Sequence, residues 1–150
     1  MALESEQVLK EVISEVLESM FFAMVEFEGC GPGDGPFDYA SEINLTNHKG
    51  CIALCLRVSE EFARMITANF LGIEESQVHD DDLTDSLKEL ANMVGGGLHA
   101  RSSYADRRLG IPTAWKIGSD GMDGEQVASG LAFACFGELV GSVVLNNLPG

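Results

Sequence analysis

Basic side chains are scarce in this chain. Its 150 residues include 9 Lys and Arg against 24 Asp and Glu, which gives a formal net charge of −15. Binding to a nucleic-acid backbone or to an anionic membrane surface requires clustered lysine and arginine. The most basic cluster, Arg101, Arg107 and Arg108, is small and more typical of a solvated helix end than of a phosphate or partner contact. The composition therefore argues against nucleic-acid and membrane partners.

Long apolar runs are also missing. No stretch reaches the roughly 20 apolar residues that a membrane-spanning helix needs, and the N-terminal residues lack the basic and apolar regions of a secretory signal. Only four cysteines are present, with no CxxC pair and no Cys/His cluster at zinc spacing. Cys51 and Cys55 would lie about 13 Å apart on one strand, too far for a disulfide. We therefore expect a cytoplasmic protein without an intrinsic metal site.

Residues 1–150 are expected to form one domain, since a chain of this length buries about 70% of its unfolded surface. Hydrophobic periodicity predicts helices over 5–25, 60–71 and 82 to about 104. Ser59 is the expected N-cap of the second helix, and Gly72 its end. Glycine-rich segments predict a loop at 29–36 and a turn region at 119–125. Alternating or apolar runs predict strands over 38–47, 51–58, 114–118, 126–136 and 138–146.

This order of elements, with hairpins in place of alternating βαβ units, predicts the fold class. Paired neighbouring strands favour a largely antiparallel sheet, and the helices must bury their apolar faces against it. We therefore expect an α/β (α+β) fold.

The segment DLTDSLKELANMVGGGLH, residues 82–99, is the most informative part of the chain. Residues spaced three and four apart share one face of a helix. Asp85, Glu89 and Asn92 therefore stack together on a polar face, pointing away from the core. The opposite, apolar stripe comprises Leu83, Leu87, Leu90, Ala91, Val94 and Leu98. The helix thus presents a carboxylate and a carboxamide side by side to the outside.

Three consecutive glycines, Gly95, Gly96 and Gly97, follow on the same helix. Each costs about 0.8–1 kcal/mol relative to alanine in a helix interior. A tight helix crossing or a helix end explains them most simply. The alternative is the close approach of a partner backbone over Glu89 and Asn92. A phosphate-binding loop is not favoured, because the GxxxxGK[ST] pattern is missing.

The pattern Asp85-x3-Glu89-x2-Asn92, followed by glycine and then by Pro112, resembles the signature of the CheC/CheX/FliY chemotaxis phosphatases. The opening segment VLKEVISEVLESMFFAM is similar to the first helix of CheX-like domains. The segments SGLAFACFG and LVGSVVLNNL are similar to their last strands. CheC and FliY proteins usually carry two Glu-x2-Asn motifs, whereas this chain has one. The resemblance is therefore to the single-motif CheX branch.

The resemblance implies a CheX-like fold with long helices on one face of the sheet, and a homodimer. It implies a phosphatase that removes the phosphoryl group from an aspartate of a CheY-like response-regulator receiver domain. The receiver would bring its own Mg²⁺ and lysine, so no intrinsic cofactor is expected. Asn92 would orient the attacking water, because a neutral carboxamide does not repel the phosphoryl group. Glu89 would pair with the receiver's lysine.

Several neighbours are expected to contact the same partner: Asp85, Ser86, Lys88, Met93 and Gly96. His99 is either a further contact or a solvated side chain. Without the resemblance, Glu89 and Asn92 would read as an ordinary solvated helix face. A non-catalytic CheX-like module that binds a receiver or another signalling protein remains the alternative function.

A metal site at His79, Asp80, Asp81 and Asp82 is not favoured, because calcium loops need regular ligand spacing and a glycine turn.

Overall fold

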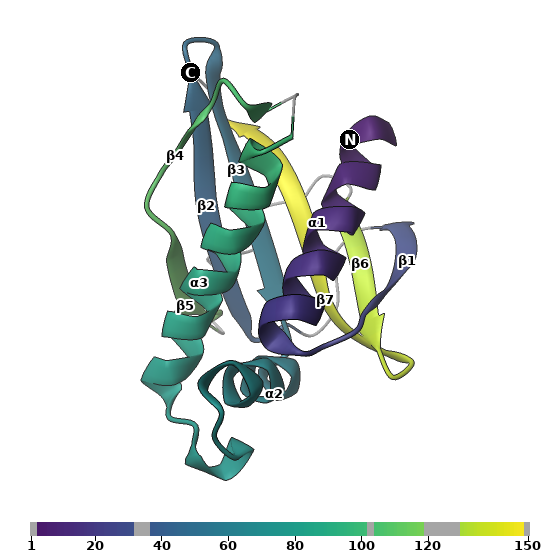
Figure 1. The fold of residues 1–150 in the computed structure, drawn as a ribbon, viewed down its shortest axis with the longest axis vertical. Helices are drawn as coiled ribbons and strands as arrows, with labels where there is room; N and C mark the ends of the chain where they lie inside the picture. Colours follow the sequence, from purple (N-terminus) through teal and green to yellow (C-terminus); the bar gives the residue numbers. More distant parts are fainter. Residues whose placement is uncertain (1–2, 32–36, 102–103, 119–129, 149–150) are drawn as a thin grey trace.

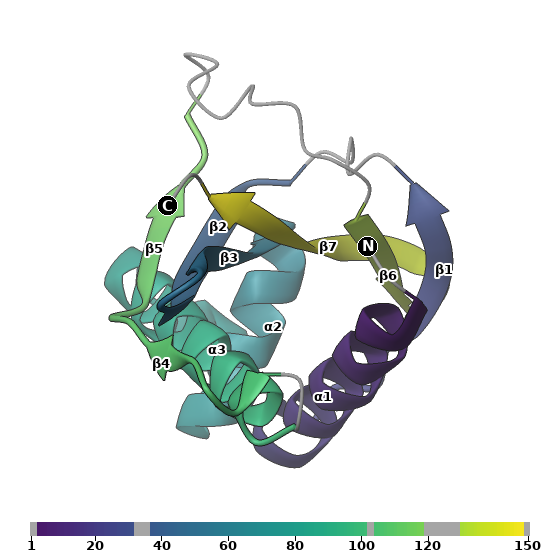
Figure 2. The same cartoon turned by 90° about the horizontal axis from the view of Figure 1, so that it is seen from above.

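The computed structural model describes residues 3–31, 37–101, 104–118 and 130–148. Three helices lie on the concave face of a seven-stranded sheet (Figures 1 and 2). The predicted α+β class, with a largely antiparallel sheet and helices on one face, is confirmed. None of the described helices is long and apolar enough to cross a membrane.

The helices and strands alternate irregularly along the chain. In chain order they are α1 (Leu3–Phe21), β1 (Glu26–Gly31), β2 (Tyr39–Asn47), β3 (Gly50–Val58), α2 (Glu60–Leu71), the short 3-10 helix η1 (Glu75–Gln77), α3 (Asp80–His99), β4 (Arg108–Leu109), β5 (Thr113–Lys116), β6 (Gly130–Cys135) and β7 (Glu138–Leu148).

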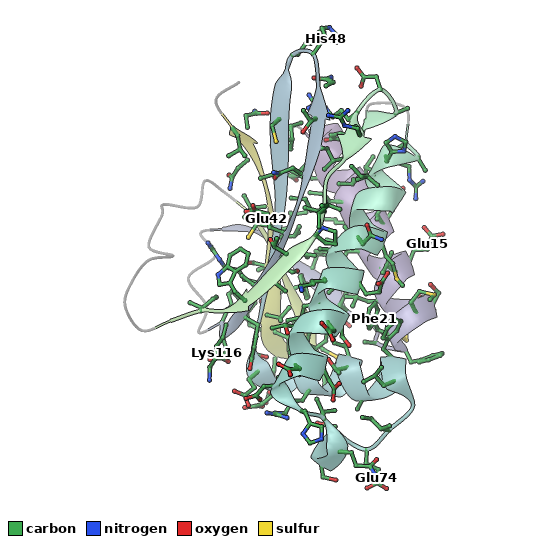
Figure 3. All side chains as sticks on the ribbon, turned by 90° about the vertical axis from the view of Figure 1, so that its left-hand side faces the viewer. Glu15, Phe21, Glu42, His48, Glu74 and Lys116 are labelled. Carbon is green, nitrogen blue, oxygen red and sulfur yellow. The ribbon has the colours of Figure 1, made fainter. Side chains whose placement is uncertain are left out.

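The strands follow the order β1-β6-β7-β3-β2-β4, and β5 also pairs with β2. Every pairing is antiparallel. One edge of β2 is divided between β5, opposite residues 39–42, and β4, opposite residues 45–46. His48 at the tip of the β2–β3 hairpin and Glu74 near η1 mark opposite ends of the molecule (Figure 3).

The core lies between the sheet and the helices. Alternation along β2 buries Tyr39, Ile43 and Leu45, as expected for a strand with one face on the core. The largest fully buried side chains come from helices and strands alike: Phe21, Phe133, Leu9, Ile13, Leu17, Ile43, Leu45, Leu54, Leu56, Ile66, Leu83 and Leu87. Helix α3 therefore rests on a continuous apolar layer.

Helix α2 begins and ends where the sequence predicts. The Ser59 hydroxyl accepts a hydrogen bond from the Phe62 N–H at 3.2 Å, which is the N-cap arrangement. Gly72 ends the helix in the left-handed conformation, with φ 70°, as a C-terminal glycine commonly does.

The end of the first helix was predicted wrongly. It stops at Phe21, before the predicted residue 25, and the unpredicted strand β1 begins at Glu26 and covers residues 29–31, where a loop was predicted. Phe22 takes a left-handed φ of 53°, and the Ala23 N–H donates to the Leu17 carbonyl at 2.9 Å. This left-handed helix ending has phenylalanine at the position where glycine is usual, so the sequence carried no stop signal.

Other boundaries shifted by a few residues. Helix α3 begins at Asp80 and ends at His99, earlier than the predicted residue 104. Strand β4 was not predicted, and the strand expected from residue 126 is described from Gly130. The predicted turn region 119–125 and part of the predicted loop, 32–36, lie outside the described residues.

Candidate functional site

The start of α3 is fixed to α2 by a single arginine. Arg64 donates to the Val78 carbonyl at 3.1 Å and to the Asp80 carboxylate at 3.3 Å, and its third contact is Glu60 at 3.0 Å. The hydrogen bond to Glu60 is the main reason that the pKa of Arg64 is raised. The guanidinium thus joins the outer surface of α2 to the first turn of α3.

Three consecutive acidic residues stabilise the N-terminal end of α3. The Asp82 carboxylate accepts the His79 N–H at 2.9 Å, and Asp80, Asp81 and Asp82 occupy the first turn. Acidic side chains in the first turn are stabilised by the helix dipole. In the described part of the chain, no group of three or more His, Cys, Asp and Glu side chains is arranged to hold a metal ion.

The middle of α3 buries its apolar stripe as predicted. No more than 1% of the surface is exposed in each of Leu83, Leu87, Leu90, Val94 and Leu98. The helix contacts β2, α1 and α2. Its orientation is therefore set by packing on several sides.

The outer face of α3 carries the predicted polar side chains. Asp85, Glu89 and Asn92 are all exposed and lie on one face of an unbroken helix. Among the described residues none of the three side chains has a hydrogen-bond or ion-pair partner. A carboxylate and a carboxamide are thus held in a fixed relation with their polar atoms available to another molecule.

The three glycines have different surroundings, and the helix continues through all of them. A β-carbon at Gly95 would lie 3.0 Å from Ile43 Cγ2, and one at Gly97 would lie 2.5 Å from Val12 Cγ1. Close packing therefore explains Gly95 and Gly97. A β-carbon at Gly96 would meet nothing within 4 Å. The packing of the described residues gives no reason for glycine at position 96.

The other predicted contact residues divide by exposure. Lys88 is exposed, and Met93 is half-buried against the core. Ser86 is only 3% exposed and lines a groove between α2 and α3, so its contact with a partner stays a prediction. It lies three residues after Leu83 and four before Leu90, on the inner side of the helix. His99 is half-buried at the end of α3.

The predicted basic cluster is not a solvated helix end. Arg107 donates to the Leu45 carbonyl at 3.0 Å and to the Gly50 carbonyl at 3.4 Å, which ties it to the β2–β3 hairpin. Arg101 contacts Glu15 of α1 at 3.3 Å. Arg108 alone is exposed without such a contact in the described part of the chain.

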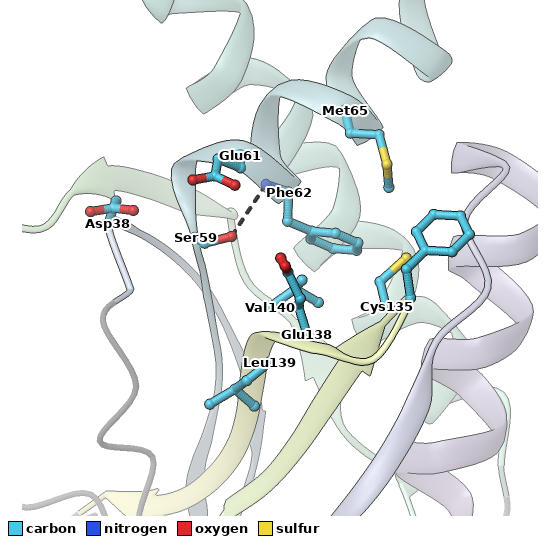
Figure 4. A pocket seen from close by; sticks show the side chains of 10 residues that line it. Asp38, Ser59, Glu61, Phe62, Met65, Cys135, Glu138, Leu139 and Val140 are labelled. Atoms are coloured by element: carbon cyan, nitrogen blue, oxygen red, sulfur yellow. Dashed lines mark hydrogen bonds between the residues drawn. The ribbon is translucent and has the colours of Figure 1, made fainter.

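Two hollows adjoin α2, and sequence reasoning found neither. A hollow of about 590 Å³ lies between the first half of α2 and the β6–β7 hairpin (Figure 4), and no predicted site residue lines it. A groove of about 300 Å³ lies between the end of α2 and α3. Its lining residues are Phe70, Leu71, Asp82, Asp85, Ser86, Glu89 and Met93. The smaller groove therefore opens directly beside Glu89.

Comparison with known protein families gives one match. The sequence profile described as chemotaxis phosphatase CheX matches residues 40–130, which is more than half of the chain. The matched range contains α3 and all of the predicted site residues. A search of curated proteins returned no match.

Solved structures of chemotaxis proteins share the fold over nearly the whole chain. CheX from Vibrio vulnificus has a TM-score of 0.74 at 17% identity, covering 95% of this chain and 99% of its own. A CheC-like protein from a Shewanella species has a TM-score of 0.74 at 18% identity, covering 97% and 99%. A CheX–CheY–BeF3–Mg²⁺ complex from Borrelia burgdorferi has a TM-score of 0.72 at 14% identity, covering 96% and 97%. At these identities the likeness concerns the fold.

Proposed function

The chain belongs to the chemotaxis phosphatase CheX family, and we propose that it hydrolyses the phospho-aspartate of a CheY-like receiver domain. One observation carries the proposal. Glu89 and Asn92 project from one face of α3, exposed and without partners in the described part of the chain. The Borrelia burgdorferi structure, a complex of a CheX protein with CheY, supports a receiver as the partner.

Asn92 is the proposed water-positioning residue. The oxygen of a water molecule attacks phosphorus in line with the bond to the receiver's aspartate, which breaks and releases inorganic phosphate. The Asn92 carbonyl oxygen accepts a hydrogen bond from that water and carries no charge that would repel the phosphoryl oxygens. Phosphoryl transfer depends mainly on positioning and electrostatics. Orienting one water is worth about 2–3 kcal/mol, or roughly a hundredfold in rate.

Glu89 is the proposed docking residue. A carboxylate beside the phosphoryl oxygens would repel them, so Glu89 suits an ion pair with the receiver's lysine better than water activation. The receiver supplies Mg²⁺ in this scheme, and the chain needs no cofactor of its own. Asp85, one turn earlier, lies at the edge of the same exposed face. Lys88, Met93 and Gly96 complete the proposed contact surface.

We also propose that the protein is a cytoplasmic homodimer. Three exposed apolar side chains at or just beyond the end of α1 support self-association: Met20, Phe22 and Met24. Phe22 is 70% exposed and also holds a positive φ, an uncommon combination for a bulky residue. Sedimentation should show a dimer that Met24→Ser weakens. A wild-type protein that stays monomeric at high concentration would contradict this part.

Phosphate release from a phosphorylated receiver tests the catalytic proposal. Asn92→Ala should lose about a hundredfold in turnover while it keeps most of its affinity, because the water loses its acceptor. Glu89→Ala should weaken both turnover and binding. Asn147→Ala is the matched control, since Asn147 is exposed on β7, away from α3.

Equal turnover in wild type and Asn92→Ala would rule out the proposed role of Asn92. A wild-type protein that binds phosphorylated receivers without releasing phosphate would identify a binding module.

A further inference from the structure

We propose that the groove between α2 and α3 receives one apolar side chain of the receiver, beside a basic residue, and thereby selects which receiver is dephosphorylated. This inference rests on the proposed function and deepens it. The groove would act before chemistry, as a specificity site. Its lining residues would not touch the phosphoryl group, and the one that it shares with the proposed docking contact, Glu89, would pair with the receiver's lysine.

The groove lies beside the exposed face of α3 that carries the proposed site. Glu89 and Asp85 belong both to the exposed face of α3 and to the lining of the groove. Any protein that docks over Glu89 therefore also covers the opening between α2 and α3. With about 300 Å³, the groove is at the small end of ligand pockets. That volume suits a single side chain better than a segment of chain.

Apolar side chains from α2 and α3 form the floor of the groove. Leu71 at the end of α2 is 45% exposed, and Phe70 and Met93 are half-buried against the core. Phe70 stacks on Phe21 with ring centroids 4.9 Å apart. Neighbouring Asn69 donates to the Phe21 carbonyl at 3.0 Å. These contacts hold the end of α2 in place, so the groove is preformed and loses little entropy on binding.

Charge identifies the chemistry of the occupant. The groove is lined by three carboxylates, Asp82, Asp85 and Glu89, and by no lysine or arginine. A second copy of this chain, with a net charge of −15, would bring more negative charge to this rim. A receiver surface that pairs a lysine or arginine with an aliphatic or aromatic side chain is complementary to it. We therefore assign the groove to the receiver.

Steady-state kinetics of Leu71→Ser against a phosphorylated receiver test the inference. We expect KM to rise about fivefold, since half of a leucine surface loses its apolar contact, and kcat to stay within about twofold. Leu71→Met should restore the wild-type KM, because methionine keeps the apolar surface. Leu148→Ser is the matched control: Leu148 is 39% exposed on β7 and should leave both constants unchanged.

The outcomes separate the two proposals. An unchanged KM in Leu71→Ser, together with lost turnover in Asn92→Ala, would overturn the specificity groove and leave the phosphatase intact. A Leu71→Ser protein that loses self-association but keeps its KM would assign the groove to a second copy. Lost selectivity among several receivers, with kcat retained, is the result we expect.

Discussion

Gly97 of α3 faces Val12 of α1 so closely that a β-carbon at residue 97 would lie 2.5 Å from Val12 Cγ1. Its neighbour Gly96 faces open space. Two adjacent glycines in one helix therefore have different origins. Helix packing requires glycine at position 97, whereas the packing of the described residues gives no reason for glycine at position 96.

Gly97→Ala should destabilise the fold. The added methyl group would force Val12 or the whole of α1 to move, and overpacking of this kind costs about 1–3 kcal/mol. Urea denaturation followed by far-UV circular dichroism measures the change. Val12 is only 1% exposed, so Val12→Ala is measured alone and with Gly97→Ala as a double-mutant cycle. Gly97→Ala should cost less in the Val12→Ala background, where the methyl group fits, and an equal cost in both backgrounds would show that the contact is not the cause.

Gly96→Ala should have opposite effects on stability and activity. Alanine in an open helix position should raise the free energy of unfolding by up to about 1 kcal/mol. If a receiver backbone approaches this turn, the same methyl group should raise KM. Both quantities are measured on one protein preparation. A stabilised variant with unchanged kinetics would remove Gly96 from the proposed contact surface.

Arg64→Met should loosen the start of α3. The Val78 carbonyl would lose its hydrogen bond from the guanidinium, at a cost of about 1 kcal/mol or more. Asp80→Ala serves as the control: its carboxylate is 82% exposed, and exposed ion pairs contribute little. Chemical denaturation compares the two variants. An equal loss in both would point to the ion pair and away from the carbonyl contact.

Cys135 should react slowly with alkylating reagents. Burial raises the pKa of its thiol, so at mildly alkaline pH a smaller fraction is thiolate, the reactive form. Cys51 is half-buried on β3 and should be labelled by iodoacetamide before Cys135. Peptide mass spectrometry follows each site separately. In urea the two rates should converge, and equal rates in the folded protein would contradict the prediction.

Local signals predicted much of the fold. The Ser59 side chain and the left-handed backbone of Gly72 delimit α2, alternation located β2, and an apolar run located β3. The misplaced boundaries depend on contacts distant in sequence. The left-handed Phe22 follows a turn held by Asn69 of α2. The two-residue β4 exists only because it pairs with β2.

For the site, helical periodicity was sufficient to place Asp85, Glu89 and Asn92 on an exposed face. The same periodicity places Ser86 on the inner side of the helix, where it lines the groove between α2 and α3, and its contact with a receiver stays a prediction. The groove could not be predicted from α3 alone, since Phe70 and Leu71 come from α2 and meet α3 only through tertiary packing.

The proposed reacting groups all come from α3, with no loop between them. In sites assembled from separate loops, local melting can abolish turnover well below the unfolding temperature. Here the relative geometry of the carboxylate and the carboxamide persists as long as this buried helix does. Thermal inactivation should therefore coincide with the cooperative loss of helix signal, and heat-stressed samples should contain either fully competent or fully unfolded molecules.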